Sequence, residues 1–102
     1  MNIAFSYLYR DAGNYKNWGQ VIFTNQQNLP IDDIRIAIQQ NLIDQQFFVA
    51  KHWRVQELFF DNHLSHQDHE WHEFDDVEFI KDFEANDCDI TEFLKRIKKL
   101  SL

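Results

Sequence analysis

Two hydrophobic periods run through this chain, one of two residues and one close to 3.6, and together they predict a fold that combines strands with helices. Residues 3–10 alternate between two sides, as a strand does. Residues 90–100 instead place their apolar side chains on one helical face, and Asp89 and Glu92 form a capping-box pattern at its start. We therefore predict a strand near the N-terminus and a helix that begins after Asp89.

A second strand and a second helix are predicted from the residues that follow the first strand. Residues 11–19 contain both glycines of the chain and predict a loop, after which residues 20–24 are rich in β-branched and aromatic side chains. The two strands would form an antiparallel hairpin with a long connection. Apolar residues then recur at helical spacing, which predicts a helix over residues 31–42.

The second half of the chain is rich in strand formers until the final helix. Residues 46–60 carry many aromatic side chains without helical order and predict two short strands. Residues 61–70 are polar and predict a loop. Residues 71–80 alternate again, but the alternation slips by one residue at Asp75 and Asp76, which indicates a β-bulge or a one-residue irregular break.

These elements predict a single domain over residues 1–102, because a chain of this length has room for one hydrophobic core. The order β-β-α-β(β)-β-α is typical of an α+β fold. We expect a largely antiparallel sheet with two helices packed on one face.

Composition excludes several classes of protein. The single cysteine cannot form an internal disulfide, no basic leader opens the chain, and no run approaches the roughly 18 apolar residues of a membrane-spanning helix, so we expect a cytoplasmic protein without a membrane partner. Two glycines cannot build a phosphate-binding loop, so we expect no nucleotide cofactor. Cys88 lies between Asp87 and Asp89, which disfavour its thiolate, so an enzyme is the less favoured class.

The whole chain has a net charge of -7, and its acidic side chains are concentrated in one part of the sequence. Residues 57–92 carry all but four of the 17 acidic side chains, and Lys81 is the only Lys or Arg among them. Such a block repels nucleic-acid phosphates and attracts basic partners, so direct nucleic-acid binding is disfavoured. The alternative is a solvated acidic surface that only keeps the protein soluble.

Our leading hypothesis is a small protein-interaction module, of an inhibitor or immunity type, that binds a basic surface of a protein partner. On an extended strand, alternate acids would present a row of negative charge. The candidate partner-binding acids are Glu70, Glu73, Asp75, Asp76 and Glu78.

The first hairpin supplies a second candidate surface. Aromatic and arginine side chains are enriched at the energetic centres of protein interfaces. The alternatives are packing within the hairpin and stacking on single-stranded nucleic acid, and the overall charge disfavours the latter. The candidates are Tyr9, Arg10, Tyr15 and Trp18.

Four histidines at three-residue intervals suggest an alternative function. Imidazole and nearby carboxylates are ligands that divalent metals accept, so the chain could be a metal-binding protein or a metal-dependent hydrolase. The H-E-x-x-H zinc motif is absent, and a polar loop of solvated histidines explains the same pattern. The candidate ligands are His63, His66, His69 and His72.

A resemblance covers most of the chain. The hairpin pattern Y-R-D-x-x-N-Y-K-x-x-G-x-V-x-F, from Tyr9 to Phe23, and the W-H-E-F segment from Trp71 to Phe74 are similar to a set of short uncharacterised bacterial proteins. The resemblance implies a bacterial or phage origin. It implies no function.

Overall fold

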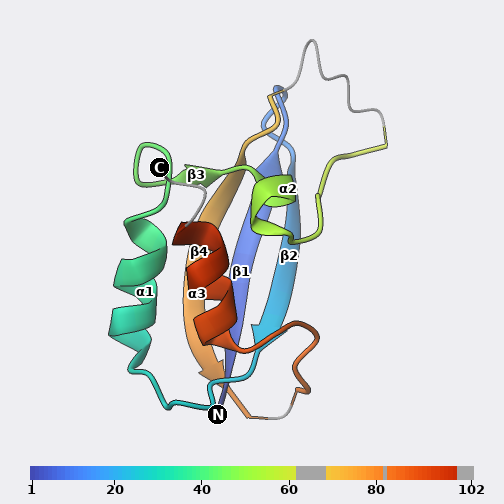
Figure 1. The fold of residues 1–102 in the computed structure, drawn as a ribbon. Coiled ribbons are helices and arrows are strands. Elements are labelled where there is room, and N and C mark those ends of the chain that lie inside the picture. Colours follow the sequence, from blue (N-terminus) through green and yellow to red (C-terminus); the bar gives the residue numbers. More distant parts are fainter. Residues whose placement is uncertain (62–68, 82, 99–102) are drawn as a thin grey trace.

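A four-stranded antiparallel sheet in the order β2-β1-β4-β3 forms one layer of the protein (Figure 1). The computed structural model describes residues 1–61, 69–81 and 83–98. The strands are β1 (Asn2–Arg10), β2 (Lys16–Phe23), β3 (Phe47–Phe48) and β4 (His72–Ile80). Strand β1 therefore lies inside the sheet, between its partner in the hairpin and a strand more than 60 residues later in the chain.

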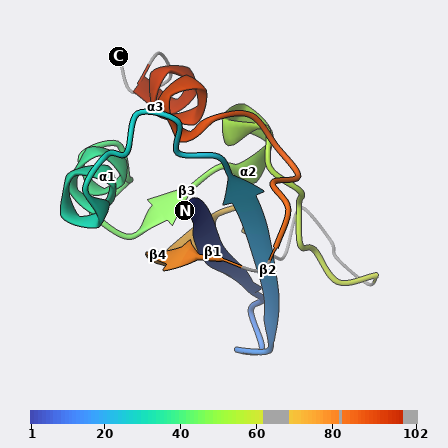
Figure 2. The ribbon, with the colours of Figure 1, turned by 90° about the horizontal axis from the view of Figure 1, so that it is seen from below.

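Helices form the second layer, all on the same face of the sheet (Figure 2). Within the described residues they are α1 (Ile31–Gln39), α2 (Ala50–Trp53) and α3 (Ile90–Lys98). None of these helices is long and apolar enough to cross a membrane. The arrangement confirms the predicted α+β class with an antiparallel sheet covered on one face.

The helix-facing side of β1 forms the centre of the core. Phe5 is completely buried, and its ring centroid lies 5.3 Å from that of Phe93 in α3 and 5.9 Å from that of Phe48 in β3. Trp53 of α2 stacks on Phe48 with centroids 4.4 Å apart. Burial raises the pKa of Tyr7 to about 12, and its hydroxyl donates to the carbonyl of Gln56 at 2.7 Å. Aromatic side chains from every layer thus meet around β1.

The predicted long hairpin connection is wrong, because β2 begins at Lys16 rather than Gln20. The turn is short: the Asp11 carboxylate accepts the Tyr15 N–H at 2.9 Å, and Asn14 takes the left-handed conformation with φ 68°. Gly19 is a strand residue. A Cβ on Gly19 would lie 2.8 Å from Leu58 Cδ1, so this glycine permits close packing rather than a turn.

Two other boundaries differ from the prediction. The first helix ends at Gln39 and is followed by turns, instead of continuing to residue 42. Residues 46–60 form one short strand and the helix α2, not two strands. Arg54 ends α2 in the left-handed conformation with φ 58°, and residues 55–60 continue as irregular chain across the core. The aromatic content of residues 46–60 predicted strands, but Trp53 packs against Phe48 from a helical turn.

The predicted slip in the last strand is confirmed as an irregularity in the pairing of β1 with β4. Asp76 lies opposite Ser6 and Phe74 lies opposite Tyr7, so Asp75 has no opposite residue on β1. This extra residue keeps apolar side chains on the helix-covered face both before and after it. The loop predicted at 61–70 falls largely outside the described residues.

The carboxylate of Asp89 joins α3 to the end of β2. One oxygen accepts the Thr91 N–H at 3.1 Å and caps the helix, and the other accepts the Thr24 hydroxyl at 2.8 Å and the Gln26 N–H at 2.9 Å. Burial alone would raise the pKa of Asp89, but these hydrogen bonds lower it to about 2. The predicted helix start is therefore also a tertiary contact.

We expect Asp89→Ala to lower the free energy of unfolding by about 1–2 kcal/mol at pH 7, because it removes a helix cap. Since the pKa of Asp89 is lower in the folded protein than the ordinary value of 3.8, the carboxylate stabilises fully above that value, and this contribution is lost as the pH falls toward 2. Urea unfolding at pH 7 and pH 2.5 measures both effects. Asp33→Ala, at an exposed acid of α1, is the control. Equal losses at the two pH values would contradict this account.

Candidate functional site

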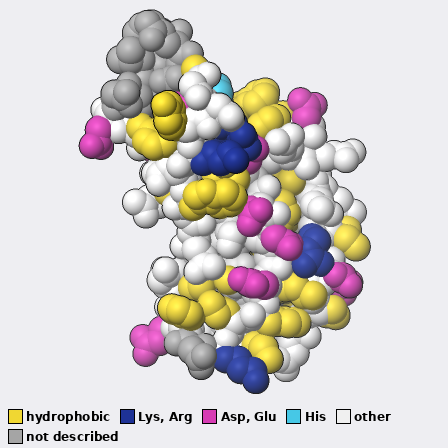
Figure 3. Space-filling view, turned by 180° about the vertical axis from the view of Figure 1, so that it is seen from behind, with side chains coloured by type: hydrophobic (Ala, Val, Ile, Leu, Met, Phe, Trp, Pro, Cys, Tyr) yellow, Lys and Arg dark blue, Asp and Glu magenta, His cyan; other side chains and the backbone are white. Residues whose placement is uncertain are grey.

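The sheet face opposite the helices has no second layer of described residues over it (Figure 2). The odd-numbered side chains of β1 contact the helices, as the ring contacts of Phe5 show, so Ala4, Ser6 and Leu8 point to the uncovered face. The register places Trp18 of β2, Leu8 of β1, Glu73 of β4 and Phe47 of β3 in one row across this face. Figure 3 shows acidic side chains along the middle of this face, with Lys or Arg above them.

Glu73 belongs to this row, but it is occupied by contacts within the protein. Arg10 Nε donates to one carboxylate oxygen at 2.7 Å, and Gln46 Nε2 donates to the other at 3.1 Å. The hydrogen bond from Arg10 outweighs burial and lowers the pKa of Glu73. Glu73 is only 7% exposed, so we assign it to the connection between β1 and the segment before β3 rather than to partner binding.

Asp76 is also held by other residues of the chain. Burial alone would raise its pKa, but hydrogen bonds from Arg35 Nε at 2.8 Å and from the Val77 N–H at 2.8 Å lower it. Arg35 further donates to the Val77 carbonyl at 3.3 Å. Because Val77 is in the part of β4 that β3 does not pair, these contacts close an exposed sheet edge.

Three acids of the predicted set are exposed and hold no such pair in the part of the chain that the structure describes. Asp75 projects from the irregularity in β4, Glu78 lies opposite Ala4 on the uncovered face, and Glu70 precedes the strand. The register therefore places Glu73, Asp76 and Glu78 on the uncovered face, and of the predicted acids Asp75, Glu78 and Glu70 hold no ion pair within the described residues.

Of the four predicted hairpin residues, two are held by contacts within the protein and two are exposed. Tyr9 is buried on the helix-covered face, and its hydroxyl donates to the carbonyl of His69 at 2.7 Å. Arg10 is paired with Glu73. Tyr15 and Trp18 are exposed, at 72% and 56% respectively. Trp18 lies opposite Leu8, so it presents a large aromatic surface on the uncovered face.

Of the four predicted metal ligands, His69 and His72 lie in the described residues. His63 and His66 lie outside the described residues. His72 is fully buried among Tyr7, Tyr9 and Phe48, and its Nε2 accepts the Leu58 N–H at 2.9 Å. In residues 1–61, 69–81 and 83–98 no group of three or more His, Cys, Asp or Glu side chains is arranged to hold a metal ion.

The sequence analysis missed two features of the uncovered face. Phe47 and Trp71 lie with ring centroids 5.4 Å apart at the β3 end of the row, and Gln46 and Arg35 engage two of the candidate acids. Each contact joins residues more than 20 positions apart. No local pattern indicates such contacts, because they depend on the order of strands in the sheet.

Comparisons with protein-family models, with curated proteins and with solved structures returned no match. The resemblance to short bacterial proteins therefore stays a prediction, and the function is inferred from the geometry alone.

We expect His72→Phe to lower the free energy of unfolding by about 1–3 kcal/mol, because it leaves the buried Leu58 N–H without its acceptor. His69→Ala, at an exposed ring, should change it by about 0.5 kcal/mol or less. Urea unfolding in the presence of a chelator measures both. Equal stability of His72→Phe and the wild type would show that this hydrogen bond is not needed for the fold.

Proposed function

We propose that this protein is a non-enzymatic interaction module that binds a basic surface of a protein partner through the uncovered face of its sheet. The observation that carries the proposal is the exposed side chain of Trp18, which lies on the same face as Glu78, a carboxylate without an ion pair in the described residues. A large exposed aromatic side chain is typical of the energetic centre of an interface.

The shape of the face supports binding to a protein. The strands give a continuous surface on which Trp18 and the pair of Phe47 and Trp71 lie at opposite ends of the same row. Leu8 and Glu73 lie between them and are almost completely buried by their neighbours, so the exposed side chains of the row are the aromatic ones at its two ends. Exposed apolar surface with a polar rim marks interaction sites.

The charge of the face supports a basic partner. Glu73 and Asp76 are neutralised by Arg10 and Arg35, whereas Asp75 and Glu78 are exposed and unpaired in the described residues. Unpaired surface carboxylates attract cationic side chains and repel phosphates. An inhibitor or immunity-type protein that occupies a basic groove is consistent with this arrangement.

The test is a pull-down from a lysate of the source organism with Asp75→Lys/Glu78→Lys and the wild type. We expect the double variant to lose a partner that the wild type retains at low salt and releases at high salt, since salt screens exposed charges. Asp76 is left unchanged because it holds Arg35 and closes the edge of β4.

The matched control is Asp33→Lys/Glu84→Lys, which makes the same change of net charge at exposed acids of α1 and of the segment before α3. Retention of the partner by the control and loss by the test variant would support the proposal. Equal retention by both variants, or loss with both, would rule out a specific role for the uncovered face.

A further inference from the structure

The backbone groups at the outer edge of β2 alternate between two directions. Ile22 points its N–H and its carbonyl away from β1, because the N–H donates to the Asn86 side chain at 2.9 Å and the carbonyl accepts the Asn86 N–H at 3.0 Å. In an antiparallel ladder every second residue has this orientation. Lys16, Trp18 and Gln20 therefore also point their N–H and carbonyl groups outward from the sheet.

Contacts from elsewhere in the chain close several other outward-facing positions of the sheet. The segment before α3 covers Ile22 through Asn86 and the Thr24 carbonyl through the Ile90 N–H, at 2.8 Å. On the opposite side of the sheet, the Gln46 carbonyl accepts the Phe74 N–H at 3.0 Å, and Arg35 covers Val77. Such contacts prevent unwanted pairing at sheet edges.

The part of β2 next to the hairpin turn is not closed in this way. Lys16, Trp18 and Gln20 are exposed, and in the described ranges of the chain no group pairs with their outward N–H and carbonyl groups. The Asn86 contact bounds this open edge on one side, and the hairpin turn bounds it on the other. It spans five residues, about 16 Å of extended strand.

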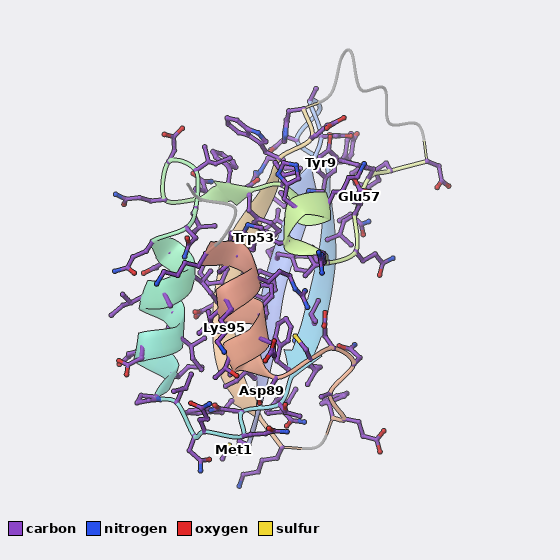
Figure 4. The ribbon with its side chains drawn as sticks, in the orientation of Figure 1. Met1, Tyr9, Trp53, Glu57, Asp89 and Lys95 are labelled. Atoms are coloured by element: carbon purple, nitrogen blue, oxygen red, sulfur yellow. The ribbon has the colours of Figure 1, made fainter. Side chains whose placement is uncertain are left out.

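The segment beside the open edge is acidic, whereas Lys16 at the end of the edge is basic. The segment after α2 runs past β2, where the Asn17 side chain donates to the Leu58 carbonyl at 3.1 Å. This segment carries Glu57 and Asp61, both exposed, and Figure 4 shows Glu57 beside the upper part of β2. A strand that adds to this edge would lie next to the Glu57 carboxylate.

We propose that the open edge, Lys16–Gln20, binds an extended segment of a protein partner as an additional strand, and that this segment carries lysine or arginine. The edge supplies outward donors and acceptors at three alternate residues, Glu57 supplies the complementary charge, and the Trp18 side chain packs against the added segment from the uncovered face. Main-chain hydrogen bonds provide affinity in this mode, and side-chain contacts provide specificity. The inference rests on the proposed function, because it names how the basic partner is held.

The probe is a blocked eight-residue peptide of alternating valine and lysine, titrated into the full-length protein while backbone amide NMR signals are recorded. We expect the Trp18 and Gln20 amides to shift and to become protected from hydrogen exchange. A peptide of alternating valine and glutamate should not bind. Two further valine-lysine peptides carry methyl groups on alternate backbone nitrogens, one on the odd-numbered and one on the even-numbered residues. The peptide whose methyl groups replace the N–H groups that face β2 should not bind, and the other should bind.

Gln20→Pro and Gln20→Ala form the decisive pair. Both remove the same side chain, but only proline also removes the outward N–H, which the ladder with β1 does not use. We expect the dissociation constant for the lysine peptide to rise about tenfold in Gln20→Pro and to stay within about twofold in Gln20→Ala. Circular dichroism and thermal unfolding establish that both variants fold.

Equal binding by Gln20→Pro and Gln20→Ala would overturn the proposal, and so would the absence of peptide binding by the wild type. If Gln20→Pro does not fold, the methylated peptides decide, and equal binding of both would overturn it. In the lysate experiment, loss of the partner with Asp75→Lys/Glu78→Lys but not with Gln20→Pro would reject strand addition and leave the proposed function. The reverse result would reject the role of the uncovered face and leave the open edge.

Discussion

The structure depends on β1, which pairs with a neighbouring strand along each edge and packs against α2 and α3 on one face. Its helix-facing side chains contact aromatic rings from β2, β3, β4, α2 and α3, with Phe5 at the centre. This one-sided packing leaves the opposite face of the sheet without a covering layer. Both proposed binding surfaces follow from that asymmetry: the uncovered face, and the edge of the strand next to β1.

Three acidic residues complete the fold, and two of them, Glu73 and Asp76, were predicted from the sequence as partner-binding residues. Glu73, Asp76 and Asp89 each accept hydrogen bonds from distant parts of the chain, and the pKa of each is lowered. They secure positions where strand pairing stops or a helix starts, because unpaired backbone groups there would otherwise be left without partners. Removing one of these acids would therefore affect stability as well as binding. The acids suited to testing binding are those without such contacts in the described residues, Asp75 and Glu78.

The accuracy of the sequence analysis depended on how local each signal was. The slip at Asp75 and Asp76 was visible in the alternation and is confirmed, and Asp89 is the helix cap that the capping-box pattern indicated. Gly19 was misread as part of a turn because its role is to admit Leu58, which comes 39 positions later. The helix α2 was missed because the aromatic residues around it are required by the core and do not report the local backbone.

By itself, the sequence determined the class of the fold, the presence of its three long strands, the start of the last helix and the segregation of acidic charge. These properties follow from hydrophobic periodicity and composition, which each segment carries alone. Only the tertiary structure decided which acids are neutralised, why His72 is a core residue, and which sheet edge is open. Those outcomes depend on strand order and register, since a side chain's partner in a sheet lies across the ladder and is often distant in the sequence.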